Sequence, residues 1–310
     1  VVPQRSLRPI RQGEPQAFYG RVNWWAEDLE ILLQDLNECQ KNGVNYHIEM
    51  AAWAGTGVWN DPAKLEGVIT AYKRLVAECR KRGLWLFVSV VNDNMHLSKY
   101  GNVGVKLGSV RAQANQLVAA IKECGPKNVI VQPVGETQTD DGRAFEIYCA
   151  AELAGFVLVS NGEGGSPSKK ATWASFRAYH PSSVSVTVAS DAFAVSDHGT
   201  TIKQLNQGGG LNTPGNPSAI KAWFAKHAKA GCPAIVLYHF QQRTHDPDAI
   251  RACALSAPQA ETSTGADQVD FSKLVWHGDF NGASAVLDVP RLSNLVFHGT
   301  KEVTFKWDVG

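Results

Sequence analysis

The stretch "VAECRKRGLWLFVSVVND" (residues 76–93) contains the end of an amphipathic helix, a glycine, a continuous apolar run and two polar residues, in that order. Gly83 suits the left-handed position that follows many helices. The apolar run after it is typical of a parallel strand that is buried on both faces. The stretch therefore predicts a helix-to-strand unit of an α/β fold, with Asn92 and Asp93 at the carboxyl end of the strand.

The same order recurs along the chain. "LNECQKNG" (residues 36–43) and "IKECG" (residues 121–125) also place a cysteine before a helix-ending glycine, and later helices end similarly at Gly155 and Gly231. The expected strands are AFYGRVN, NYHIEMAA, LWLFVSVV, NVIVQPV, GFVLVS, VSVTVAS, a weak candidate at residues 210–213, and AIVLYHF. Eight such units over residues 18–254 predict a (β/α)8 TIM barrel of class α/β. An open doubly wound sheet is the alternative, but no G-x-G-x-x-G motif follows the first strand.

The chain divides into four expected segments. Residues 1–17 form an N-terminal extension, and residues 18–254 form the barrel. Residues 255–270 are rich in Ser, Thr, Gly and Ala, as linkers are. In residues 271–310, "LVWHGDFNGASAVLDV" is echoed by "LVFHGTKEVTFKWDV", which predicts a small C-terminal β-rich appendage of hairpins. This tail is a candidate for self-association or for anchoring to a larger assembly.

The composition narrows the class of partner. The 310 residues are 44% hydrophobic, and 30 basic residues against 29 acidic ones give a net charge of +1. This charge balance favours neither nucleic acid nor an anionic membrane as a partner. No apolar run reaches the roughly 18 residues of a membrane span. We expect a soluble protein, either secreted with its signal already removed or part of an extracellular assembly. The six cysteines are expected to be free thiols, and the sequence predicts no metal site and no cofactor.

Carboxylates follow several of the expected strands. The active site of a (β/α)8 barrel lies at the carboxyl ends of its strands, so polar residues there are candidates for function. Cleavage of a glycosidic bond needs a protonated carboxyl group and a second carboxylate. The sequence therefore predicts a glycoside hydrolase whose catalytic candidates are Glu49, Glu136, Glu163 and Asp191.

Aromatic and amide side chains accompany these acids, as expected for a polysaccharide or oligosaccharide substrate. Tryptophan rings can stack on sugars, and amides can bind hydroxyl groups. The expected platforms are Trp24, Trp25, Trp53 and Trp59. The other expected substrate-binding residues are Asn23, Asn92, Asp93, Asn161, Tyr238, His239 and Gln241.

Glu136 follows the apolar run "NVIVQPV" directly after Gly135. This layout resembles the retaining (β/α)8-barrel glycoside hydrolases that carry an acid/base glutamate at the end of the fourth strand and a nucleophilic glutamate at the end of the seventh. The resemblance implies that Glu136 is the acid/base. An asparagine usually precedes that glutamate in the clan, whereas Gly135 stands here. The segment that matches the seventh strand, "GGGLNTPGN", contains no carboxylate, so the nucleophile is not found by resemblance.

The partner of Glu136 therefore stays open among Glu49, Glu163 and Asp191. A separation of about 5 to 5.5 Å between the two carboxyl groups implies retention, and roughly 6.5 to 9.5 Å implies inversion. A Schiff-base lyase is disfavoured because no expected strand contains a lysine. The alternative from another class is a non-catalytic carbohydrate-binding or assembly protein on a barrel scaffold.

Overall fold

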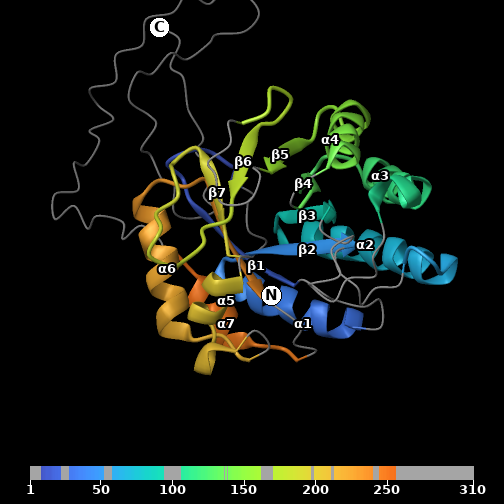
Figure 1. Cartoon of the computed structure of the whole chain (residues 1–310). Helices are drawn as coiled ribbons and strands as arrows, with labels where there is room; N and C mark the ends of the chain where they lie inside the picture. Colours follow the sequence, from blue (N-terminus) through green and yellow to red (C-terminus); the bar gives the residue numbers. More distant parts are fainter. Residues whose placement is uncertain are drawn as a thin grey trace, which may run out of the picture. The chain divides into compact units, whose positions relative to one another are not determined.

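A computed structural model describes residues 8–21, 28–51, 58–93, 106–135, 137, 139–161, 170–196, 199–210, 213–239 and 244–255 (Figure 1). The chain divides into two units, residues 1–259 and residues 260–310. The second unit, with the expected hairpin tail, lies outside the described residues. Among the helices that the structure describes, none is long and apolar enough to cross a membrane.

Eight parallel strands close into a barrel in sequence order, with β8 paired to β1. The expected (β/α)8 architecture is therefore confirmed. The strands are β1 (Gln16–Arg21), β2 (Asn45–Ala51), β3 (Leu86–Val91), β4 (Val129–Val134), β5 (Val157–Asn161), β6 (Phe176–Tyr179), β7 (Ala192–Val195) and β8 (Ala234–His239).

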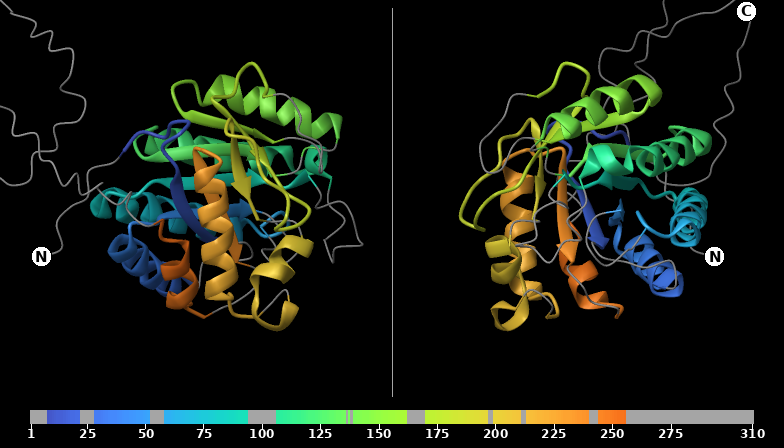
Figure 2. Two further views of the ribbon diagram at one scale, coloured as in Figure 1. Left: turned by 90° about the vertical axis from the view of Figure 1, so that its left-hand side faces the viewer. Right: turned by 45° about the vertical axis from the view of Figure 1, so that its right-hand side comes forward.

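Helices pack along the outside of much of the barrel, as Figures 1 and 2 show. Within the described ranges, one α-helix follows each of β1 to β4, two follow β7 and one follows β8. Residues 180–191, between β6 and β7, contain no helix. The helices are α1 (Leu29–Asn42), α2 (Pro62–Arg82), α3 (Arg111–Cys124), α4 (Asp140–Glu152), α5 (Gly199–Leu205), α6 (Pro217–Lys229) and α7 (Pro247–Cys253), with short 3-10 helices η4 (Leu107–Val110) and η5 (Gln207–Gly209).

Local sequence determines where the helices begin and end. Gly43 and Gly83 adopt left-handed conformations, with φ of 68° and 65°, directly after α1 and α2. Their backbone N–H groups donate to carbonyls of the last helical turn, as the sequence predicted. At the start of α2, the Asp61 side chain accepts hydrogen bonds from two backbone N–H groups, and Pro62 occupies the first helical position.

The apolar side chains form two cores. One fills the space between the barrel and its helices and includes Leu36, Leu75 and Leu117. The other lies inside the barrel, where Phe87 contacts Phe18 and Phe193 edge-on, with ring centroids 6.2 and 5.6 Å apart. Such edge-to-face contacts suit the opposed charges of aromatic edges and faces.

Residues 8–15 close the amino-terminal end of the barrel. Ile10 is buried in the inner core. The carbonyl of Arg8 accepts hydrogen bonds from the side chains of Trp85 and Gln16, at 2.8 and 3.0 Å. Gly13 N–H donates to Gly231 O, just before β8. This end is therefore sealed by apolar and backbone groups.

Two strand predictions are wrong. The expected sixth strand, residues 184–190, is irregular, because its backbone is bonded to side chains instead of to a neighbouring strand. Lys226 Nζ donates to Val184 O, and Gln204 Oε1 accepts from Val184 N–H. The weak seventh candidate at residues 210–213 is not β7 either, since Gly210 follows η5. The actual β6 and β7 have four residues each, which is too short for a clear alternating pattern.

Candidate active site

Polar side chains replace the apolar core inside the barrel toward the carboxyl ends of the strands. β2 contributes His47 and Glu49, β3 contributes Ser89, β4 contributes Gln132 and β8 contributes Tyr238. Each of these five residues is at most 3% exposed. In each strand, they continue the inward-facing set by alternation, as Ser89 follows Phe87 two residues later.

His47, Ser89, Gln132 and Tyr238 form a polar floor. Ser89 Oγ donates to Gln132 Oε1 at 2.7 Å and lies 3.4 Å from the Tyr238 hydroxyl. The imidazole of His47 contacts the rings of Tyr238 and Phe87, with centroids 4.5 and 4.6 Å away. Burial lowers the pKa of His47 to about 3, so the imidazole is neutral at physiological pH. The floor therefore carries no net charge.

Gly20 makes room for this floor. A Cβ atom at position 20 would lie 2.5 Å from both Cβ and Cδ2 of His47. Only glycine can occupy this inward position of β1 while the imidazole lies across it.

Glu49 and Asn92 meet beside Gly135. A Cβ atom on Gly135 would lie 3.3 Å from Glu49 Oε1 and 3.5 Å from Asn92 Nδ2. Glu49 is 3% exposed and Asn92 is 2% exposed. The glycine before Glu136 thus adjoins two of the expected site residues, and their side chains occupy the space that a larger residue would need.

The chain on both sides of position 136 is held by hydrogen bonds. Gly135 N–H donates to Val91 O, and Asn161 Nδ2 donates to Gly135 O, both at 2.7 Å. The hydroxyl of Thr137 donates to Glu146 Oε1 at 2.8 Å. The link between β4 and α4 is therefore tied to β3, β5 and α4.

Asp93 fixes the next part of this link. It accepts hydrogen bonds from the backbone N–H and the hydroxyl of Thr139, at 2.6 and 2.9 Å. The Thr139 side chain in turn accepts from Gly142 N–H and so caps α4. Asp93 is only 1% exposed. Its carboxylate therefore holds the start of α4, and the geometry does not favour the expected role in binding substrate.

Two buried amide atoms at this end have no hydrogen-bond partner within the described part of the chain. They are Nε2 of Gln132 and Oδ1 of Asn161. Buried polar groups in proteins are nearly always bonded, so such atoms indicate contact with water or a polar ligand. Gln132 belongs to β4, the strand that leads to Gly135, and Asn161 ends the neighbouring strand β5.

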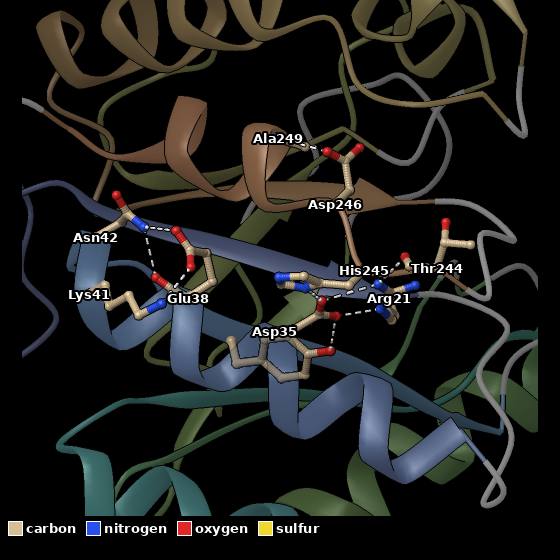
Figure 3. Close-up of polar contacts among 10 residues, drawn as sticks. Arg21, Asp35, Glu38, Lys41, Asn42, Thr244, His245, Asp246 and Ala249 are labelled. Carbon is tan, nitrogen blue, oxygen red and sulfur yellow. Dashed lines mark hydrogen bonds and ion pairs between the residues drawn. The ribbon is translucent and has the colours of Figure 1, made fainter.

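A second polar cluster lies outside the barrel, at the carboxyl end of β1 (Figure 3). The guanidinium of Arg21 donates to both carboxylate oxygens of Asp35 in α1 and, at 2.7 Å, to Thr244 O. Asp35 also accepts from Tyr46 at 3.0 Å, and His245 Nδ1 lies 2.8 Å from it. This buried cluster ties the end of β1 to the chain before α7. The segment that bears Trp24 follows Arg21 in the sequence, and the segment that bears Gln241 precedes Thr244.

Many of the expected site residues lie outside the described residues. They are Glu136, Glu163, Asn23, Trp24, Trp25, Trp53 and Gln241. His239 ends β8, but its side chain is not among those described.

Asp191 lies away from the carboxyl ends of the strands, and Trp59 is buried. The strand prediction that placed Asp191 at a carboxyl end is wrong, because Asp191 directly precedes β7 and so lies at its amino end. There Asp191 forms an ion pair with Arg177 at 2.7 Å, which lowers the pKa of its carboxyl. Trp59 is 5% exposed and belongs to the core between barrel and helices, so its ring is not a surface platform.

Sequence reasoning missed His47, Ser89, Gln132 and Glu146. The first three were detectable, because each is a polar residue at an inward position of an otherwise apolar strand. Glu146 lies in a helix, 9% exposed, and nothing in the local sequence distinguishes it from a surface glutamate. Burial raises its pKa to about 7, and nearby Asp93 adds to the rise.

The described residues contain no group of three or more His, Cys, Asp or Glu side chains arranged to hold a metal ion. All six cysteines are free thiols, as expected, and five of them are buried. Burial raises the pKa of Cys79 and Cys232 to about 12, so neither thiol is reactive at neutral pH.

No protein-family model and no curated protein sequence matches the chain. Among solved structures, it is similar to an endo-β-1,4-mannanase from Thermotoga petrophila, with 8% identity, a TM-score of 0.44, and coverage of 78% of this chain and 77% of that one. A family 5 glycoside hydrolase from Prevotella bryantii B14, bound to a xyloglucan tetradecasaccharide, is 10% identical with a TM-score of 0.41, over 72% and 85% of the two chains.

An aldolase is also similar. The phospho-2-dehydro-3-deoxyheptonate aldolase of Thermotoga maritima is 11% identical, with a TM-score of 0.34, over 77% of this chain and 68% of that one. The neighbours are mostly family 5 glycoside hydrolases, but they include enzymes with other chemistry. The TIM-barrel fold of this chain follows from its own strand pairing, and these similarities do not decide its reaction.

Proposed function

We propose that the protein is a glycoside hydrolase that cleaves a polysaccharide or oligosaccharide at the carboxyl ends of the barrel strands. Glu136 acts as the general acid, and a second carboxylate either attacks the sugar or activates water. The observation that carries the proposal is the position of Glu49: a buried carboxylate on an inner strand, beside the residue that precedes Glu136.

Glu49 is the favoured partner of Glu136. It belongs to β2, and its Oε1 atom lies close to Gly135. Asp191 is at the other end of its strand and is already paired with Arg177, so it is no longer a candidate. Glu163 follows β5 in the sequence and stays an alternative partner.

The environment of Glu49 supports an uncharged polyhydroxyl substrate. Ser89 is the register partner of Glu49 in the neighbouring strand, and together with Gln132 and Tyr238 it offers neutral donors and acceptors. His47 is neutral. Such groups suit sugar hydroxyls, which both donate and accept hydrogen bonds. Trp24, Trp25 and Trp53 are proposed to supply stacking surfaces in the loops after β1 and β2.

Other chemistries have less support. A Schiff-base lyase needs a lysine in the barrel, and none of the eight strands contains one. A non-catalytic carbohydrate-binding protein would need the same polar groups but not the buried Glu49. We further propose that residues 271–310, beyond the linker, join chains or anchor the protein outside the cell.

The test is an assay of wild type and Glu136→Gln on a broad panel of polysaccharides, measuring both new reducing ends and retention of the polymer by the protein. The matched control is Glu14→Gln, which changes a half-exposed carboxylate near the amino-terminal end of the barrel. We expect wild type and the control to cleave one substrate class, and Glu136→Gln to bind it but cleave it at least 100-fold more slowly. Binding without cleavage by all three proteins would support the carbohydrate-binding alternative, and equal cleavage by all three would remove Glu136 from the mechanism.

A further inference from the structure

Three hydrogen bonds connect four residues near position 136, here called the Glu146 network: Gly135, Thr137, Glu146 and Asn161. The side chain of Asn161 donates to Gly135 O at 2.7 Å. The backbone N–H of Asn161 donates to the carboxyl of Glu146, which also accepts from the Thr137 hydroxyl at 2.8 Å. Both neighbours of position 136 are thereby tied to one carboxyl group, Thr137 directly and Gly135 through Asn161.

The network is buried. Thr137 is 3% exposed, and Glu146 and Asn161 are each 9% exposed. The charged groups that face Glu146 are Asp93, after β3, and Arg143, one turn earlier on α4. Burial, with Asp93, raises the pKa of Glu146 to about 7, so its carboxyl is mostly neutral below that pH. Hydrogen bonds in such a water-poor site are stronger than at the surface and hold their partners more firmly.

Helix α4 does not need Glu146 for its own docking. Thr139 caps its first turn, and Asp93 holds Thr139. Phe145 and Cys149, both fully buried, anchor the helix to the hydrophobic core. The contacts of Glu146 instead go to residues that flank position 136, which indicates a role in shaping the chain there.

We propose that Glu146 is a positioning residue that holds the chain on both sides of Glu136, through Thr137 and Asn161, so that the acid keeps the geometry for proton donation. This inference rests on the proposed function for the role of Glu136. Misplacement of a catalytic group by about 1 Å can lower a rate by a factor of roughly 100, so small displacements of this chain are expected to lower kcat.

Three variants of the full chain test the network. Glu146→Leu removes the acceptor, Thr137→Val removes the donor hydroxyl at nearly equal volume, and Glu146→Gln keeps a neutral acceptor of the same size. The first measurement is amide hydrogen exchange by mass spectrometry at pH 6. We expect exchange over residues 135–139 to be at least tenfold faster in Glu146→Leu and Thr137→Val, within threefold of wild type in Glu146→Gln, and unchanged in β2 and β8.

The second measurement is steady-state kinetics on the substrate that wild type cleaves. We expect kcat to fall at least tenfold in Glu146→Leu and Thr137→Val, with KM within twofold of wild type, and Glu146→Gln to restore kcat to within threefold. The double variant is expected to be no slower than the slower single variant, because both changes break the same network.

The two measurements separate the inference from the function on which it rests. Unchanged exchange over residues 135–139 in both Glu146→Leu and Thr137→Val would overturn the positioning role, even in an active hydrolase. Faster exchange with an unchanged kcat would overturn it too. Faster exchange in a protein that cleaves no glycan would support the network and refute the proposed function.

Discussion

Replacing Glu146 by glutamine is expected to change how the stability of the protein depends on pH. The carboxyl of Glu146 has an ordinary pKa of 4.5 in the unfolded chain and a pKa raised to about 7 in the fold, mainly by burial. Between these two values, the folded state binds a proton that the unfolded state lacks, so stability falls as pH rises. The contribution is complete below pH 4.5 and lost above pH 7. A rise from 4.5 to about 7 corresponds to about 3 kcal/mol, as an order of magnitude.

Glutamine has the shape of the neutral carboxyl and does not titrate. Urea unfolding of wild type and Glu146→Gln at pH 4.5 and pH 8 isolates the effect, because other ionisable groups cancel in the difference. We expect similar stability at pH 4.5 and an advantage of about 3 kcal/mol for the variant at pH 8. An equal difference between the two proteins at both pH values would contradict a raised pKa in the fold, since Glu146 would then titrate alike in the folded and unfolded states.

Three further predictions concern the barrel itself. Asp35→Asn should lower the free energy of unfolding by roughly 3 to 5 kcal/mol, because it leaves the buried Arg21 without its carboxylate. Glu123→Gln, which breaks an exposed pair with Lys73, should cost far less in the same urea assay, and equal losses would contradict the ranking. Gly20→Ala should cost about 1 to 3 kcal/mol because its Cβ would overlap His47, whereas Gly199→Ala, which meets nothing within 4 Å, should be nearly neutral; a stable Gly20→Ala would show that the imidazole does not lie there. The imidazole of His47 should stay neutral from pH 5 to pH 8, so its side-chain NMR shifts should not move in that range; a transition near pH 6.5 would indicate an exposed ring.

The barrel was predictable from the sequence because its first five units follow simple rules. The apolar strands β2 to β5 each follow a helix and a glycine with positive φ, at residues 43, 83, 125 and 155, and this order identifies a parallel sheet without any tertiary information. The later units break these rules. β6 and β7 have four residues each, and their register comes from pairing with β5 and β8. A run such as residues 184–190 alternates like a strand, yet lysine and glutamine side chains of α5 and α6 bind its backbone.

The candidate site was predictable in part. Glu49 and Asn92 were expected at strand ends, and the structure brings both beside Gly135. Asp191 was misplaced because its strand was misassigned, and the error moved it to the opposite end of the barrel. Glu146 could not be found from sequence, because its role depends on Thr137 and Asn161, which come from other elements. Long-range contacts of this kind leave no local pattern.

Whether Glu49 belongs to a catalytic site is decided by the rate at which Glu49→Gln releases new reducing ends from the substrate that wild type cleaves. The variant keeps the size of the buried side chain but replaces its carboxyl group by an amide. Catalysis by carboxylates at the carboxyl ends of the strands predicts a loss of at least about 100-fold, with polymer binding retained and with Glu14→Gln unchanged. Cleavage by Glu49→Gln at the wild-type rate would contradict the claim that this carboxylate belongs to the catalytic site.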